Sequence, residues 1–182
     1  MSNQPPEPNA IPSGLAVLLV TGDLLDQEVD VIVNAWNQNL IPHWLLITQG
    51  VSGAIKKRTG SVPFDELRKG GTMRLGEARL TQAPNLKFKG IIHVAGINHL
   101  WRSSESSVRM CVRNALELAT RHGFRSIAFP AIGAGSSLPL GKKREISLWG
   151  VSTSRSLELI EEEVRNSCYQ GKVVIVRYAQ HY

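Results

Sequence analysis

Short runs of β-branched and aliphatic residues alternate along this chain with longer segments whose apolar residues recur every three or four positions. The short runs predict buried strands, and the longer segments predict amphipathic helices. We expect strands over residues 15–20, 29–33, 75–81, 90–95, 126–130 and 172–176. Because strands and helices alternate, we expect an α/β fold in which a mixed, largely parallel sheet has helices on both faces.

Three segments have the pattern of helices. The clearest runs from Ser104 to His122, where the apolar positions keep helical spacing and Gly123 follows as a stop signal. A short helix is expected over residues 52–59, with small residues in its first turn. A further long helix is expected from the three-or-four step of Ile146, Trp149, Thr153, Leu157, Ile160 and Val164.

Polar residues stand at the ends of the first two predicted strands. Asn34 and Asn37 follow the second strand, and Asp23 follows Gly22 at the end of the first. In an α/β sheet the carboxyl ends of the strands form the ligand crevice, and asparagine offers both a donor and an acceptor. Asparagine also suits tight turns, and Asp23 suits the cap of the turn after it. The pattern alone leaves a ligand contact and a turn open at each position.

Two glycine-bearing segments lie where the chain leaves a strand and approaches a helix. Glycine permits close approach of a ligand, and exposed N–H groups at a helix start attract anionic oxygens, so together the two segments predict a cradle for a diphosphate. They fit neither the dinucleotide fingerprint, since Leu138 takes the place of its last glycine, nor the spacing of a P-loop. The segments are Gln49-Gly50-Val51-Ser52-Gly53 and Gly133-Ala134-Gly135-Ser136-Ser137.

The chain has 182 residues, 42% of them hydrophobic, which suits one domain over residues 14–182. Residues 1–13, rich in proline and polar residues, are expected to be a disordered tail. We expect a cytoplasmic protein without a membrane segment, because no apolar run reaches roughly 20 residues and the start does not resemble a signal peptide. Cys111 and Cys168 lack the spacing of a metal site, so we expect reduced thiols, no metal and no cofactor.

A formal net charge of +6 favours acidic partners, either phosphate-bearing ligands or nucleic acid. The basic residues form short groups at residues 56–58 and 142–144, without the interleaved aromatic residues on which bases stack. A solvated helix face is therefore the favoured role of each group. Nothing in the sequence predicts the oligomeric state.

In their order along residues 15–178, these segments resemble the macrodomain family, whose members bind ADP-ribose. The similar segments are Gly22-Asp23-Leu24-Leu25, residues 29–37, Gly50-Val51-Ser52-Gly53-Ala54-Ile55, Leu75-Gly76-Glu77-Ala78, residues 91–96 and residues 126–132. The resemblance implies a three-layer α/β/α fold.

The resemblance also implies a ligand set. Asp23 would accept a hydrogen bond from the adenine amino group, Asn37 would reach the distal ribose, and Tyr178 would lie against adenine, while Asn34 would support the site. Backbone N–H groups of the two glycine-bearing loops would hold the diphosphate. The residues expected to bind the ligand are Asp23, Leu24, Asn37, Gly50, Val51, Ser52, Gly53, Gly133, Ala134, Gly135, Ser136, Ser137 and Tyr178.

Departures from the family pattern leave catalysis open. Hydrolytic members carry an aspartate where this chain has Ser52 and an aromatic residue where it has Ser137. Asn37 is expected to orient the ribose, and Lys56 or Lys57 is an alternative nucleophile by similarity to another branch of the family. The leading hypothesis is a mono-ADP-ribosyl hydrolase acting on a modified protein or nucleic acid. The alternatives are a non-catalytic ADP-ribose reader and a basic domain that binds poly-ADP-ribose or RNA.

Overall fold

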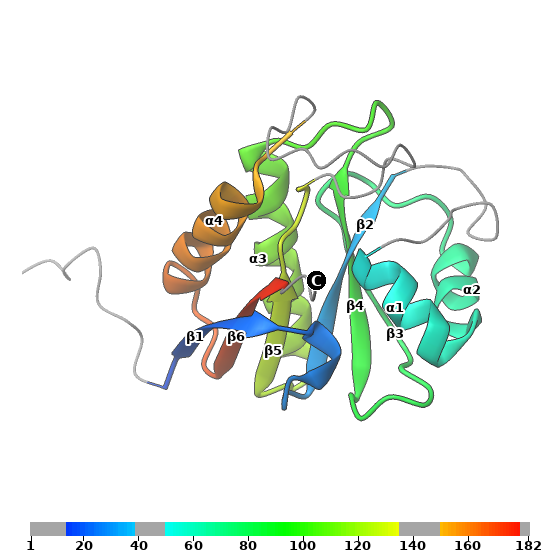
Figure 1. Cartoon of the computed structure of the whole chain (residues 1–182), viewed down its shortest axis with the longest axis horizontal. Coiled ribbons are helices and arrows are strands. Elements are labelled where there is room, and N and C mark those ends of the chain that lie inside the picture. Colours follow the sequence, from blue (N-terminus) through cyan, green and yellow to red (C-terminus); the bar gives the residue numbers. More distant parts are fainter. Residues whose placement is uncertain (1–13, 39–49, 135–149, 179–182) are drawn as a thin grey trace, which may run out of the picture.

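The computed structural model describes residues 14–38, 50–134 and 150–178 and shows a six-stranded sheet between two layers of helices (Figure 1). The strand order is β1-β6-β5-β2-β4-β3, and every neighbouring pair is parallel except β3 with β4. The strands are β1 (Ala16–Gly22), β2 (Val31–Asn37), β3 (Ala78–Thr81), β4 (Gly90–Ile97), β5 (Ser126–Pro130) and β6 (Lys172–Tyr178).

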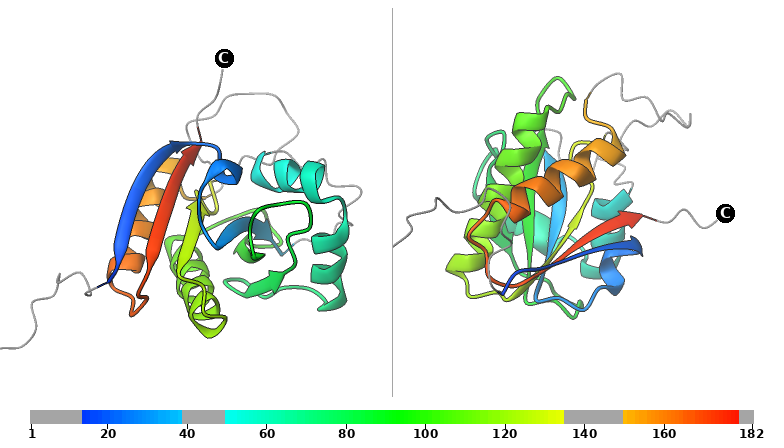
Figure 2. Two further views of the ribbon diagram at one scale, coloured as in Figure 1. Left: turned by 90° about the horizontal axis from the view of Figure 1, so that it is seen from below. Right: turned by 90° about the vertical axis from the view of Figure 1, so that its left-hand side faces the viewer.

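Helices cover both faces of the sheet, as the further views in Figure 2 show. Helices α1 (Gly50–Thr59) and α2 (Val62–Lys69) contact β2 and β3 on one face, whereas α3 (Glu105–Arg121) and α4 (Thr153–Arg165) contact β4 and β6 on the other. A single turn of 3-10 helix, η1 (Leu24–Asp26), follows β1. The expected α/β fold with three layers is confirmed.

Each face of the sheet has its own hydrophobic core, because successive side chains of a strand point to opposite faces. In β2, Val31 and Val33 belong to the core beneath α3 and α4, while Ile32 belongs to the core beneath α1 and α2. All three side chains are fully buried. This strand is uninterrupted in its β-branched residues because helices cover both of its faces, as the sequence pattern predicts.

The predicted elements are found with shifted ends. Strands β1, β2 and β6 continue to Gly22, Asn37 and Tyr178, and β3 begins only at Ala78. Helix α2 is not predicted from the sequence. The last helix begins at Thr153 behind the capping side chain of Ser152, and Ile146 and Trp149 lie outside the described residues.

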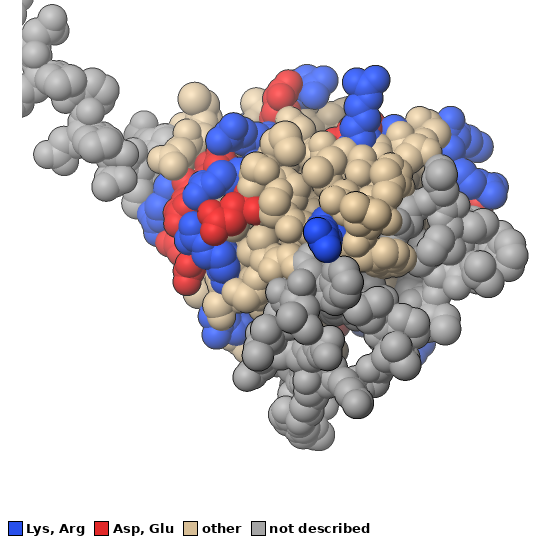
Figure 3. Space-filling model, turned by 90° about the horizontal axis from the view of Figure 1, so that it is seen from above, with Lys and Arg blue, Asp and Glu red and all other residues tan. Residues whose placement is uncertain are grey.

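Charged side chains link α3 to α4 on the outer surface. Arg109 and Arg113 both bind Glu163, whose side chain is only 7% exposed, and Arg155 binds Glu105. Figure 3 shows blue and red side chains interspersed on the side of the molecule where these helices lie. Much of the positive charge on this surface is therefore neutralised locally.

In the parts of the chain that the structure describes, no helix is long and apolar enough to cross a membrane. The same residues contain no group of three or more histidine, cysteine, aspartate or glutamate side chains arranged to hold a metal ion. Cys111 is fully buried in the core, and burial raises the pKa of its thiol to about 12.

Candidate functional site

Five parallel strands end at one edge of the sheet, and residues at or just after the ends of β1, β6, β5 and β2 form the candidate site. Asp23 follows β1, and Gly22 before it pairs in register with Tyr178 at the end of β6. The segment leading to Gly133 follows β5, and Asn37 ends β2. Three strand spacings separate β1 from β2, which is about 14 Å. An elongated ligand along this edge therefore meets a carboxylate at one end and an amide at the other.

Asp23 is half-buried and caps the turn after β1. Its Oδ1 accepts a hydrogen bond of 2.9 Å from the backbone N–H of Leu25, and its carbonyl accepts one of 2.7 Å from the side chain of Gln27. The capping role is therefore present. The second carboxylate oxygen, Oδ2, has no hydrogen-bond partner among the described residues. Capping by Oδ1 thus leaves Oδ2 available to a ligand amine.

Asn37 lies at an irregularity of the sheet. The register between β2 and β4 shifts after Trp36, so that Trp36 pairs with Ala95 and Asn37 with Ile97. Such a bulge changes the direction of the side chain that follows it. The indole of Trp36 packs against the ring of Phe64 in α2, with centroids 5.5 Å apart. The bulge and this packing set where the Asn37 amide stands at the strand end.

The loop after β5 is fixed by two serine hydroxyls. Ser156 of α4, which is fully buried, accepts from the N–H of Ile132 and donates to its carbonyl, both at 2.8 Å. Ser103 donates to the carbonyl of Gly133 at 2.6 Å and accepts from the N–H of Val151 at 2.9 Å. Gly133 has a φ of 72°, and a Cβ there would lie 2.6 Å from the Cβ of Ser103. The described start of this loop therefore has one defined conformation.

The first turn of α1 begins at Gly50, which has a φ of 67° that only glycine adopts readily. No acidic residue lies in this turn, whereas the last turn carries Lys56 and Lys57. The partial positive charge at the helix start is therefore not met by a side-chain carboxylate of that turn, which favours an anionic ligand.

Ser52, in the position of the expected acid, points its hydroxyl toward the sheet. It donates a hydrogen bond of 2.7 Å to Oδ1 of Asn34, whose Nδ2 lies 3.0 Å from Nδ1 of His93. Nε2 of His93 lies 2.9 Å from the hydroxyl of Thr81. His93 is fully buried, and burial lowers its pKa to about 3. His93 is therefore a neutral interior residue, and Asn34 supports the first turn of α1.

The remaining predicted residues differ in placement. Tyr178 is 66% exposed at the end of β6, and Leu24 is buried in η1. Lys57 is exposed and Lys56 is half-buried. Lys56 lies roughly 9 Å along the axis of α1 from Gly50, and Lys57 follows it. Gly135, Ser136 and Ser137 lie outside the described residues. Ala134 is half-buried next to Gly133, and Val51 and Gly53 are half-buried in α1.

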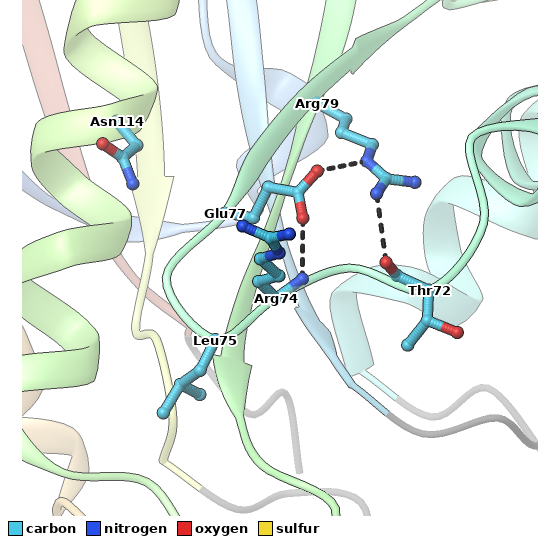
Figure 4. Close-up of a pocket in the computed structure, with 6 residues that line it drawn as sticks. All are labelled: Thr72, Arg74, Leu75, Glu77, Arg79 and Asn114. Carbon is cyan, nitrogen blue, oxygen red and sulfur yellow. Dashed lines mark hydrogen bonds and ion pairs between the residues drawn. The ribbon is translucent and has the colours of Figure 1, made fainter.

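An open groove of about 600 Å³ lies beside β3 and α3 and is lined by none of the predicted ligand residues (Figure 4). In it Glu77 binds Arg79, which also donates to the carbonyls of Gly71 and Thr72. Burial of Glu77 raises its pKa, but the hydrogen bonds from Arg79 and from the N–H of Arg74 outweigh it, so the net shift is downward. Arg79 therefore serves to hold the loop before β3. The groove's other lining residues are Leu75 and Asn114.

Ser103, Ser156 and Thr81 are the residues of this region that sequence reasoning misses. Each acts through a hydroxyl that contacts a residue at least 12 positions away in the chain. Serine and threonine are common and follow no spacing in such contacts. Capping serines do leave a signal in the sequence, as at the start of α3, where Ser104 and Ser107 form a reciprocal capping box.

Comparisons with known proteins identify the family of this chain. The model of the family described as "Macro domain" matches residues 33–140. An O-acetyl-ADP-ribose deacetylase from Salmonella newport is 34% identical over 160 residues, covering 83% of this chain and 86% of the relative. The macrodomain of Oceanobacillus iheyensis with ADP is 27% identical, with a TM-score of 0.66 over 89% of this chain and 83% of that one. The Trypanosoma brucei macrodomain in complex with ADP, 24% identical with a TM-score of 0.71 over 91% of this chain and 64% of that one, supports the fold. The chain belongs to the macrodomain family.

Proposed function

We propose that this protein binds ADP-ribose along the carboxyl edge of its sheet and hydrolyses the bond that joins ADP-ribose to a modified macromolecule. The observation that carries the proposal is the order of groups on that edge. Asp23 and Asn37 stand three strands apart, with the loop at Gly133 between them and the start of α1 beside β2. ADP-ribose has the same order of parts: an amine-bearing base, a diphosphate and a distal ribose.

Each group has a role that its chemistry supports. Oδ2 of Asp23 accepts a hydrogen bond from the adenine amino group, and the exposed ring of Tyr178 packs against the base. Backbone N–H groups of α1's first turn and of the loop from Gly133 onward hold the diphosphate. The Asn37 amide hydrogen-bonds the distal ribose. The ligand set of this proposal is the one that the sequence predicts, including Gly135, Ser136 and Ser137.

Hydrolysis requires a water molecule to attack while the bond to the acceptor breaks. In this account Asn37 orients the distal ribose, and the ligand's own phosphate assists the water. The relative from Salmonella newport is named as an O-acetyl-ADP-ribose deacetylase, so an ester of ADP-ribose is the first substrate class to test. A cytoplasmic location suits the absence of a membrane-spanning helix among the described residues and belongs to this proposal.

A second candidate, a reader without turnover, is favoured by one observation. Ser52 donates its hydroxyl proton to Asn34 and is a poor base, so no side chain at that position activates water. The third candidate, a nucleic-acid-binding domain, draws less support. On the α3–α4 surface, Arg109, Arg113 and Arg155 are all paired with glutamates.

A release assay tests turnover. The protein is incubated with a mono-ADP-ribosylated protein, with ADP-ribosylated DNA and with O-acetyl-ADP-ribose, and free ADP-ribose is measured. We expect release from at least one substrate and its loss in Asn37→Ala. If no substrate is cleaved while the wild type binds ADP-ribose, the hydrolase proposal is wrong and the reader stands. Lys56→Ala and Lys57→Ala separate the lysine route, because only that route requires either amine.

A further inference from the structure

Four polar side chains form a continuous chain from α1 to the edge strand β3. Ser52, Asn34, His93 and Thr81 are joined by contacts of 2.7, 3.0 and 2.9 Å. The last three are buried and lie on neighbouring strands, with Asn34 and His93 as direct partners in the β2–β4 register. The chain thus connects the candidate ligand loop with a strand that no ligand in this account reaches.

The hydrogen bonds that join these four side chains all run in one direction, because the chemistry of each atom decides whether it donates or accepts. Nδ2 of Asn34 only donates, so Nδ1 of His93 accepts and the neutral ring carries its proton on Nε2. That N–H donates to the hydroxyl of Thr81, whose own proton goes to the carbonyl of Gln82 at 3.3 Å. At the other end Oδ1 of Asn34 only accepts, so Ser52 gives its proton inward.

The histidine ring is held in place by packing as well. The ring of Phe64 lies edge-on to it with centroids 5.8 Å apart, and Trp36 packs on Phe64. Since a charged imidazole would be costly in this fully buried position, the ring stays neutral and the order of donors is kept.

We propose that Thr81, His93 and Asn34 are positioning residues that hold the first turn of α1 and present Ser52 to the ligand as a hydrogen-bond acceptor. The inference rests on the proposed function, in which this turn contacts ADP-ribose. Because the Ser52 proton is used inside the protein, the remaining lone pairs of its oxygen accept from a ribose hydroxyl or a water molecule. A carboxylate at this position would also accept, but its charge would repel the diphosphate. Serine keeps the acceptor and removes the charge.

The direction of these hydrogen bonds is measured on the free protein by the ¹⁵N shifts of the His93 ring, which report its tautomer. We expect a neutral ring protonated on Nε2, unchanged between about pH 5 and pH 8. A ring protonated on Nδ1 would reverse every hydrogen bond and leave the Ser52 proton free to donate. That result, or a ring that titrates in this range, overturns the inference.

The positioning role is measured with Thr81→Val, which keeps the side-chain shape and removes the hydroxyl. We expect about three- to tenfold weaker ADP-ribose binding and a shifted amide resonance of Ser52, with both restored in Thr81→Ser. The control is Thr59→Val, at the far end of α1. It removes an equally buried hydroxyl, which donates to the carbonyl of Ile55.

Equal effects of Thr81→Val and Thr59→Val, or no effect of Thr81→Val, would show that these hydrogen-bonded side chains do not position the first turn of α1. If the wild type fails to bind ADP-ribose at all, the proposed function and the ligand half of this inference both fall. The His93 tautomer and the Ser52 resonance still decide the positioning half, because they need no ligand.

Discussion

The hydroxyl of Ser103 donates a 2.6 Å hydrogen bond to the carbonyl of Gly133, at the start of the loop that follows β5. The same oxygen accepts from the N–H of Val151, just before α4. One side chain therefore ties together two backbone segments that lie 18 positions apart, and it does so next to the proposed diphosphate site.

Replacing Ser103 by alanine tests this tie. We expect Ser103→Ala to lower the free energy of unfolding by about 1–2 kcal/mol, because the N–H of Val151 loses its partner, and to weaken ADP-ribose binding by a similar amount. Denaturant unfolding and calorimetric titration measure the two effects. Ser167→Ala is the matched control, since its hydroxyl donates to the carbonyl of Val164 at the far end of α4. Binding that weakens equally in both variants would show that the tie has no role at the ligand.

A second variant tests the packing of Gly133. Gly133→Ala adds a Cβ 2.6 Å from the Cβ of Ser103 and also places alanine at a φ of 72°. Gly123→Ala has the same backbone cost, with a φ of 70°, but its Cβ would meet nothing within 4 Å. We expect Gly133→Ala to lower the melting temperature clearly more than Gly123→Ala. Equal losses would mean that the contact with Ser103 relaxes without cost.

Stability should depend on pH through His93. Its pKa is lowered to about 3 in the folded protein, against an ordinary value near 6.5. Below pH 6.5 the unfolded chain therefore binds a proton that the folded protein does not. As the pH is lowered, the free energy of unfolding falls by up to about 1.4 kcal/mol per pH unit.

Denaturant unfolding of the wild type and of His93→Gln at pH 7, 6 and 5 measures this slope. The wild type should lose more stability than the variant between pH 6 and pH 5. Carboxylates whose pKa is lowered in the folded protein contribute a pH dependence that is common to both proteins, so the difference between the two profiles reports His93. At Asp30, for example, burial raises the pKa, but Lys89 and the N–H of Arg125 lower it further, so the contribution of Asp30 is lost as pH falls below its ordinary value near 3.8. Parallel pH profiles would contradict a buried neutral histidine.

The ion pairs formed by α3 and α4 differ in burial, and their contributions to stability should differ with it. Arg109→Met keeps the apolar stem but removes a partner of Glu163, so we expect a loss of about 1–2 kcal/mol. Arg165→Met breaks an exposed pair with Glu161 within one helix and should cost less than about 0.5 kcal/mol. Denaturant unfolding of both variants measures the difference, and similar costs would contradict it.

The elements of the sheet are predictable from the sequence because burial leaves a local pattern. The run Val31-Ile32-Val33 predicts a strand, and the helical spacing before Gly123 predicts α3. Helix α2 escapes prediction, since Pro63 stands in a short segment between glycines and resembles a loop. A proline is nevertheless tolerated in a first helical turn, and Phe64 and Leu67 supply the buried face.

The candidate site is predictable only in part. Asp23, Asn37 and the glycine-bearing loops follow strand ends, so their positions along the sheet edge follow from the order of the strands. The hydroxyls of Ser103, Ser156 and Thr81 act across the fold on partners that no spacing in the chain connects. The direction of the hydrogen bonds at Ser52 likewise depends on His93, which is 41 positions away.

The central claim, that the carboxyl edge of the sheet binds ADP-ribose, is tested most directly by calorimetric titration of the free protein with ADP-ribose. We predict micromolar binding by the wild type, at least tenfold weaker binding by Asp23→Ala, and unchanged binding by Asp26→Ala, which removes an exposed carboxylate one turn further on. No binding by the wild type, or equal affinity in Asp23→Ala, would contradict the account.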